Sequence, residues 1–119
     1  MVLPKRIRQW DIYSANLGES HDTWIMVLSS TETNEIMEST IVACEIVPES
    51  VQKLIPSPLN FPVQPVDTGL DWPATASVMT LASLPRNCLV ALEGRLESAG
   101  LRASVLKGTE ILFGTTPWP

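Results

Sequence analysis

The side chain best suited to move protons near neutral pH is that of His21, the only histidine of the chain. It lies in the segment GESHDTWIMVLSS, residues 18–30, where a polar turn passes into an apolar run. A histidine with an ordinary pKa of about 6.5 serves as either general acid or general base. A lone loop histidine beside acidic residues such as Glu19 and Asp22 is more often a solvated turn residue, so the catalytic interpretation of His21 competes with a purely structural one.

Basic residues open the chain and are missing from the segment that follows. Lys5, Arg6 and Arg8 lie at the start, whereas residues 11–49 contain acidic residues but no lysine or arginine, and the net charge is −5. Attraction to phosphate comes mainly from lysine and arginine. The composition therefore argues against broad nonspecific binding of nucleic acid, and any polyanion site must be small.

Other patterns that would indicate a cofactor or a metal are missing from the sequence. Cys44 and Cys88 are too few and too far apart to indicate a disulfide framework or a zinc site, and they are expected to be buried free thiols. The sequence contains no Gly-x-Ser-x-Gly motif, phosphate loop or dinucleotide fingerprint. We therefore expect no metal and no cofactor.

The apolar pattern predicts a mainly β fold with one C-terminal helix. Residues 98–114 have helical spacing of apolar residues, with Ser98 as the N-cap and Gly114 as the C-cap, and Leu101, Val105, Leu106, Leu112 and Phe113 form the predicted stripe. Five to seven mostly antiparallel strands should form a sheet or small barrel on which this helix packs. The predicted strands are residues 7–15, 24–28 (buried on both faces and therefore central), 40–47, 76–84 and 89–94.

The 119 residues fit a single domain, 1–119. Residues 48–73 hold six of the ten prolines and are predicted to form loops with short edge strands, while residues 74–119 hold the late strands and the helix. No stretch approaches the roughly 20 apolar residues of a membrane span, and the N-terminus lacks a secretory pattern. We expect a cytoplasmic protein with no membrane association.

Four segments, taken in order, resemble the MazF/PemK family of toxins from bacterial toxin–antitoxin modules. RQWDIYSANLG is similar to the opening strand of the family, and HDTWIMVLS is similar to its second strand. ASVMTLASLPRNCL is similar to the later strand that leads to Arg-Leu, and VALEGRLESAGLRASVLKGTEILFG to the last turn and the terminal helix. The resemblance covers most of the chain apart from the proline-rich middle.

The resemblance implies an SH3-like barrel of the MazF/CcdB/Kid type that forms a homodimer. It also implies an mRNA interferase, an endoribonuclease that cuts single-stranded RNA without metal and is silenced by an antitoxin protein. In such cleavage the ribose 2′-hydroxyl is the nucleophile, so the site needs a base, an acid and a group that stabilises the phosphorane charge. DNA lacks that hydroxyl and would be spared.

Several residues depart from the family pattern. The strand-two arginine aligns with Thr23, the threonine that closes the third strand aligns with Val47, and a further arginine of some members falls near Met79. Trp10 replaces the glycine of the opening strand. Both residues most often assigned to chemistry are therefore replaced, whereas some members carry a histidine in the first loop.

On this resemblance we predict His21, Arg8 and Arg6 as catalytic residues, and Lys5, Thr23, Trp24 and Arg86 as RNA contacts. Each has a plainer alternative: Trp10 and Trp24 fit the core as well as a base-stacking groove, and Arg86 fits a surface turn. Trp72 and Trp118 fit either local packing or a partner contact.

Two other functions compete with the toxin nuclease. A catalytically degenerate protein of the same fold would act by binding a protein or a nucleic acid, in keeping with the replaced residues and the acidic composition. A CcdB-like gyrase inhibitor would use its C-terminal tryptophan, and LFGTTPWP bears only a faint likeness to that tail.

Overall fold

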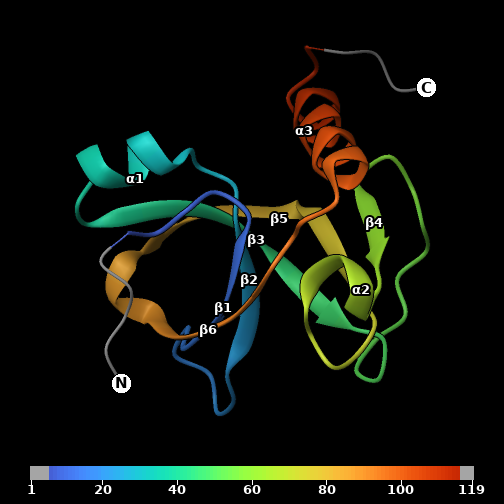
Figure 1. The fold of residues 1–119 in the computed structure, drawn as a ribbon, viewed down its shortest axis with the longest axis horizontal. Helices are drawn as coiled ribbons and strands as arrows, with labels where there is room; N and C mark the ends of the chain where they lie inside the picture. The colour runs from blue at the N-terminus through green and yellow to red at the C-terminus, as the bar shows by residue number, and fades with distance from the viewer. Residues whose placement is uncertain (1–5, 116–119) are drawn as a thin grey trace.

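A computed structural model describes residues 6–115 of the chain (Figure 1). Strands and helices follow the predicted order, with two short helices added between strands. None of the helices in the described range is long and apolar enough to cross a membrane. In chain order the elements are β1 (Asp11–Ala15), β2 (Thr23–Val27), α1 (Thr31–Ile36), β3 (Thr40–Pro48), β4 (Asn60–Val63), α2 (Pro65–Thr68), β5 (Ala74–Pro85), η1 (Arg86–Cys88, a 3-10 turn), β6 (Leu89–Arg95) and α3 (Ala99–Leu112).

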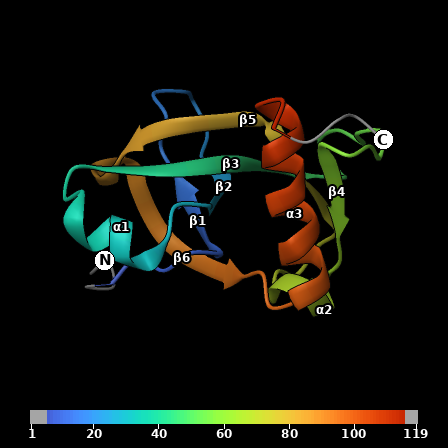
Figure 2. The same cartoon turned by 90° about the horizontal axis from the view of Figure 1, so that it is seen from above.

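The six strands form one antiparallel sheet in the order β4-β5-β3-β2-β1-β6. The sheet curls like a barrel without closing, and α3 lies beside the β4 end while α1 lies at the far side (Figures 1 and 2). The prediction of a mainly β fold with a C-terminal helix is confirmed, as is the central place of β2.

Successive side chains of the central strands point to opposite faces of the sheet, and both faces are buried, so the sequence of these strands is continuously apolar. Ile25 and Val27 face one core cluster, whereas Met26 faces the other, so β2 is buried on both sides. Cys44 belongs to the cluster on the α3 side and Cys88 to the opposite one, and both are free buried thiols, as predicted. The sheet therefore separates two apolar clusters.

The helices α1 and α2 have no counterpart in the prediction, which expected a polar segment and proline-rich loops there. Each is too short to show a helical period, and local caps hold both. Ser30 caps α1 by accepting from the Thr33 N–H, and Gln64 with Asp67 forms a capping box on α2. The predicted short edge strand of this region is β4, at one end of the sheet.

Helix α3 begins and ends where its caps predict. The Ser98 hydroxyl accepts from the Leu101 N–H, and Gly114 adopts a left-handed φ of 76° that ends the helix. Of the predicted stripe, Leu101 and Val105 face the sheet, but Leu106, Leu112 and Phe113 are exposed because the buried face runs through positions 101, 105 and 108. A Cβ on Gly108 would lie 2.9 Å from the Pro58 carbonyl oxygen and 2.9 Å from Phe61 Cζ, so glycine there permits close contact with the chain at β4.

The first strand begins later than predicted, at Asp11 rather than at residue 7. Trp10 has a φ of 78°, in the left-handed region that favours glycine, and this residue interrupts the extended backbone. Its indole is buried in the core, with the Arg102 guanidinium carbon 5.7 Å from the ring centroid. The chain therefore keeps a glycine-type backbone at the position where the resemblance places a glycine.

Candidate active-site rim and the charged network

His21 lies on the exposed loop between β1 and β2, and its side chain is 74% exposed. Its Nε2 atom is 3.7 Å from a carboxylate oxygen of Glu19. A shallow cavity of about 60 Å³ opens beside it. We call this surface the His21 rim, and its lining residues are His21, Asp22, Thr23, Trp24, Glu45, Ile46, Val47, Pro48 and Val51.

Glu45 is the rim residue that sequence reasoning missed. Between Ala43 and Glu45 the pairing of β3 with β5 is irregular, and the Glu45 N–H donates to Thr80 Oγ1 at 2.7 Å. Burial raises the pKa of the Glu45 carboxyl, and the negative charge of Glu19 raises it further. Glu45 therefore retains its proton at a higher pH than an ordinary glutamate does.

The rim combines two proton-exchanging groups with a hydroxyl. His21, Thr23 and Glu45 line the same cavity. Trp24 pairs with Ile46 across β2 and β3, which brings Thr23 and Val47, the positions of the family arginine and threonine, to the same end of the sheet. No lysine or arginine of residues 6–115 lines this cavity. The lining therefore offers an imidazole and carboxyl groups for proton transfer, but no lysine or arginine of the described chain to bind a phosphate.

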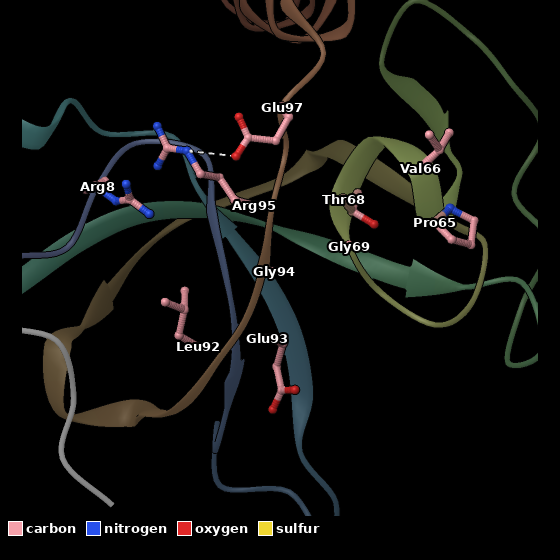
Figure 3. A pocket seen from close by; sticks show the side chains of 10 residues that line it. All are labelled: Arg8, Pro65, Val66, Thr68, Gly69, Leu92, Glu93, Gly94, Arg95 and Glu97. Atoms are coloured by element: carbon pink, nitrogen blue, oxygen red, sulfur yellow. Dashed lines mark ion pairs between the residues drawn. The ribbon is translucent and has the colours of Figure 1, made fainter.

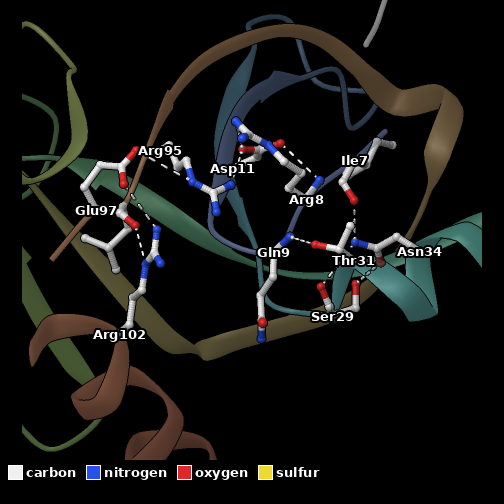
Figure 4. Close-up of polar contacts among 11 residues, drawn as sticks. Ile7, Arg8, Gln9, Asp11, Ser29, Thr31, Asn34, Arg95, Glu97 and Arg102 are labelled. Carbon is white, nitrogen blue, oxygen red and sulfur yellow. Dashed lines mark hydrogen bonds and ion pairs between the residues drawn. The ribbon is translucent and has the colours of Figure 1, made fainter. Parts of the chain in front are cut away.

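Arg8 and Arg95 belong to a charged network at the opposite end of β2 (Figure 4). Asp11, only 1% exposed, accepts from Arg95 Nη1 at 2.9 Å and from the Arg8 N–H at 3.1 Å, and Arg8 Nη2 lies 3.4 Å from it. Arg95 Nε also lies 3.7 Å from Glu97. We call Arg8, Asp11 and Arg95 the Asp11 network, in which the two arginines compensate a buried carboxylate.

The other two predicted cations in the described chain contact α1. Arg6 Nε lies 2.6 Å from a Glu35 carboxylate oxygen, and Arg86 Nη1 donates to the Asn34 carbonyl at 2.6 Å. Asn34 itself is fully buried and donates to the Ile7 carbonyl at 3.0 Å. Arg6 and Arg86 therefore contact α1, and neither lines the His21 rim.

The structure does not bring the three predicted catalytic residues together within one chain. Arg8 precedes Trp10, whose N–H donates to the Val27 carbonyl at the end of β2, whereas His21 precedes the start of that strand. Figure 1 shows the β1–β2 loop and α1 at opposite sides of the sheet. Among the predicted RNA contacts, Thr23 and Trp24 line the rim, and Lys5 lies outside the described residues, as does Trp118.

A larger cavity of about 540 Å³ lies between α2 and β6 (Figure 3). Arg8 and Arg95 line it together with Glu93 and Glu97, so its charges are mixed. A Cβ on Gly94 would lie 2.5 Å from the Thr68 carbonyl oxygen, which explains how β6 passes so close to α2. Both arginines of this cavity contact Asp11, and no histidine of residues 6–115 lines it.

No family model and no curated protein matches the chain. Solved structures do match it along nearly its whole length. A mycobacterial endoribonuclease in complex with its cognate antitoxin is 14% identical, covers 98% of this chain and 100% of its own, and has a TM-score of 0.72. A second endoribonuclease from a mycobacterial species is 13% identical, with 97% of both chains covered and a TM-score of 0.75. The Mycobacterium tuberculosis toxin MazF-mt6 is 17% identical over 87% of this chain and 96% of its own, with a TM-score of 0.70. The chain has the MazF-type fold that the sequence predicts.

Proposed function

We propose that this protein is a MazF-like toxin of a toxin–antitoxin module, an endoribonuclease that cleaves single-stranded mRNA in the cytoplasm. The observation that carries the proposal is the match of fold, over 97–98% of the chain, to solved endoribonucleases, one of them bound to its antitoxin. The rim supports it, because His21 and Glu45 supply the two proton transfers that cleavage through the ribose requires. The proposed assembly is a homodimer that an antitoxin protein inhibits.

In the proposed reaction the His21 imidazole accepts the proton of the ribose 2′-hydroxyl. The 2′-oxygen then bonds to phosphorus while the bond from phosphorus to the 5′-oxygen breaks. Glu45, whose raised pKa favours the protonated carboxyl, donates a proton to that leaving oxygen. The products are a 2′,3′-cyclic phosphate and a free 5′-hydroxyl, and no metal takes part.

The charge of the phosphorane requires a cation that the rim of one chain lacks. We propose that Arg6 or Arg8 of a second copy supplies it, since both side chains are about half exposed while their own chain places them at the other end of β2. Thr23 and Trp24 would contact the RNA beside the scissile phosphate, with Lys5 and Arg86 as further contacts to its backbone.

The direct test is cleavage of a labelled single-stranded RNA in the presence of EDTA. We expect products that end in cyclic phosphate, a loss of at least about 100-fold in rate for His21→Ala, and no cleavage of DNA of the same sequence. Glu38→Gln is the matched control, because Glu38 is an exposed acid outside the rim. Unchanged cleavage by His21→Ala would refute the mechanism.

The cation from a second copy has its own test. His21→Ala and Arg8→Ala variants should each be weak alone, and mixing them should restore activity, because each mixed dimer contains one site with an intact histidine and an intact arginine. Arg6→Ala, mixed in the same way, shows which arginine acts. Failure of both mixtures to gain activity over the separate variants contradicts the shared site.

The second candidate is a binding protein of the same fold without nuclease activity. It is favoured by Val47 and Thr23, which leave the rim with neither arginine nor a threonine from β3. RNA that binds but stays intact at high protein concentration would support this function. The gyrase-inhibitor alternative depends on Trp118, which lies outside the described residues.

A further inference from the structure

A second cavity, beside the rim but facing the β6 side, has aromatic walls. Its volume is about 240 Å³, and we call it the tryptophan pocket. The Trp24 and Trp72 rings meet edge to face, with centroids 5.0 Å apart and planes at 70°. Both indoles pack on the core and stay partly exposed, so the pocket is a preformed aromatic surface.

Carboxylates surround these two rings. Asp22, Asp71 and Glu93 line the pocket, and within residues 6–115 none of the three forms an ion pair. Glu93 is held in place, because the buried Ser14 hydroxyl donates to its Oε1 at 3.1 Å. A fixed carboxylate next to an aromatic wall requires little reorganisation when a ligand binds.

None of the cations of the described chain forms an ion pair with these carboxylates. No lysine or arginine of residues 6–115 lines the pocket. Arg95, two residues from Glu93 on the same strand, is bound to Asp11 at 2.9 Å and to Glu97 at 3.7 Å. The pocket therefore places three carboxylates that form no ion pair within the described chain beside an aromatic surface, which is the chemistry that attracts an organic cation.

We propose that the tryptophan pocket binds an arginine side chain of a protein partner. The guanidinium stacks on the indole faces and donates to carboxylates in a planar, two-pronged geometry, which suits the mixture of aromatic and acidic groups here. Inside this pocket a phosphate group is a less suitable ligand than a guanidinium, because it would approach three carboxylates. The proposal concerns binding only and does not depend on RNA cleavage.

The test follows the indole N–H resonances of the tryptophans by NMR during titration with N-acetyl-arginine amide. The Trp24 and Trp72 signals should shift and reach saturation at ligand concentrations up to about 50 mM, while the signal of the buried Trp10 should not move. N-acetyl-citrulline amide, neutral and nearly identical in shape, should bind at least about tenfold more weakly. Binding should weaken further when the salt concentration rises.

Variants assign the effect to the carboxylates. Glu93→Gln and Asp71→Asn should each weaken arginine binding about three- to tenfold, whereas the distant Glu38→Gln should not change it. An unshifted Trp10 signal in each variant shows that the fold is intact.

Three outcomes overturn the proposal. They are no shift of the pocket signals, equal binding of arginine and citrulline, or a stronger response to cytidine monophosphate that Glu93→Gln increases. The last would indicate a nucleobase pocket instead.

Discussion

The charged side chains at the two ends of strand β2 differ in burial and in pairing. At one end the Asp11 network places a carboxylate that is 1% exposed between Arg8 and Arg95. At the other end, His21 is 74% exposed and its Nε2 lies 3.7 Å from a Glu19 carboxylate oxygen. Arg8 and Arg95 therefore compensate a buried charge, whereas the His21 side chain is largely exposed to solvent.

The difference has energetic consequences. Removing one partner of a buried pair leaves an uncompensated charge and costs about 3–5 kcal/mol, whereas exposed pairs contribute about 0–1 kcal/mol. Substitutions in the Asp11 network should therefore change stability more than substitutions on the rim do.

The largest effect on stability is expected for Arg95→Ala. The variant leaves the buried Asp11 with only the half-exposed Arg8 and should lower the free energy of unfolding by about 3 kcal/mol. Urea denaturation followed by circular dichroism measures this change. Arg8→Ala is the matched comparison and should cost about 1 kcal/mol, so equal losses would contradict the dominant role of Arg95.

A smaller, pH-dependent effect is expected for Glu45→Gln on the rim. Because the pKa of Glu45 is raised in the folded state above the ordinary 4.5, the folded chain binds the proton more tightly than the unfolded chain does. Stability is therefore lost as pH rises from below 4.5 through the raised pKa, and Glu45→Gln removes that loss.

Thermal unfolding between pH 3 and 8 tests this expectation, with Glu38→Gln as the control. The variant should unfold at a slightly higher temperature than the natural chain near neutral pH, and the gap should shrink as the pH falls below 4.5. A gap that grows in acid would show that the pKa of Glu45 is lowered rather than raised.

The smallest effect is expected for Arg6→Ala. Its 2.6 Å contact with Glu35 joins two exposed side chains, so its loss should change the free energy of unfolding by less than about 0.5 kcal/mol. Chemical denaturation with Glu35→Gln and the double variant completes the cycle. A coupling above about 1 kcal/mol would place Arg6 among the structural arginines and weaken its role as a cation for a second copy.

The sequence predicted the elements that contain long apolar runs or clear caps. It did not predict the short helices or the backbone conformation at Trp10, which depend on single local contacts. The run at residues 24–28 identified β2, and the caps Ser98 and Gly114 identified α3. Helices α1 and α2 are shorter than two helical turns, so no period could reveal them. The left-handed Trp10 could not be expected from a residue type that seldom adopts that backbone.

The candidate site was predictable only in part. His21 stood out because of its chemistry and Thr23 through the resemblance, and both line the rim. Glu45 was missed because its place depends on the irregular pairing of β3 with β5, which leaves no pattern in one strand. Arg6 looked available because its partner Glu35 lies 29 positions away. Asp11 is only three positions from Arg8, but its burial against Arg95, 84 positions away, leaves no local pattern.

The thiols of Cys44 and Cys88 lie on opposite sides of the sheet, so each can report on the opening of its own side. Burial raises the pKa of Cys44 to about 12, so a reagent that attacks thiolates gains access only when the side covered by α3 opens, while Cys88 is exposed by opening of the other side. The molecule thus contains a built-in pair of labelling sites. The relative rates at which Cys44 and Cys88 are modified would tell whether the two sides of the sheet open together or separately.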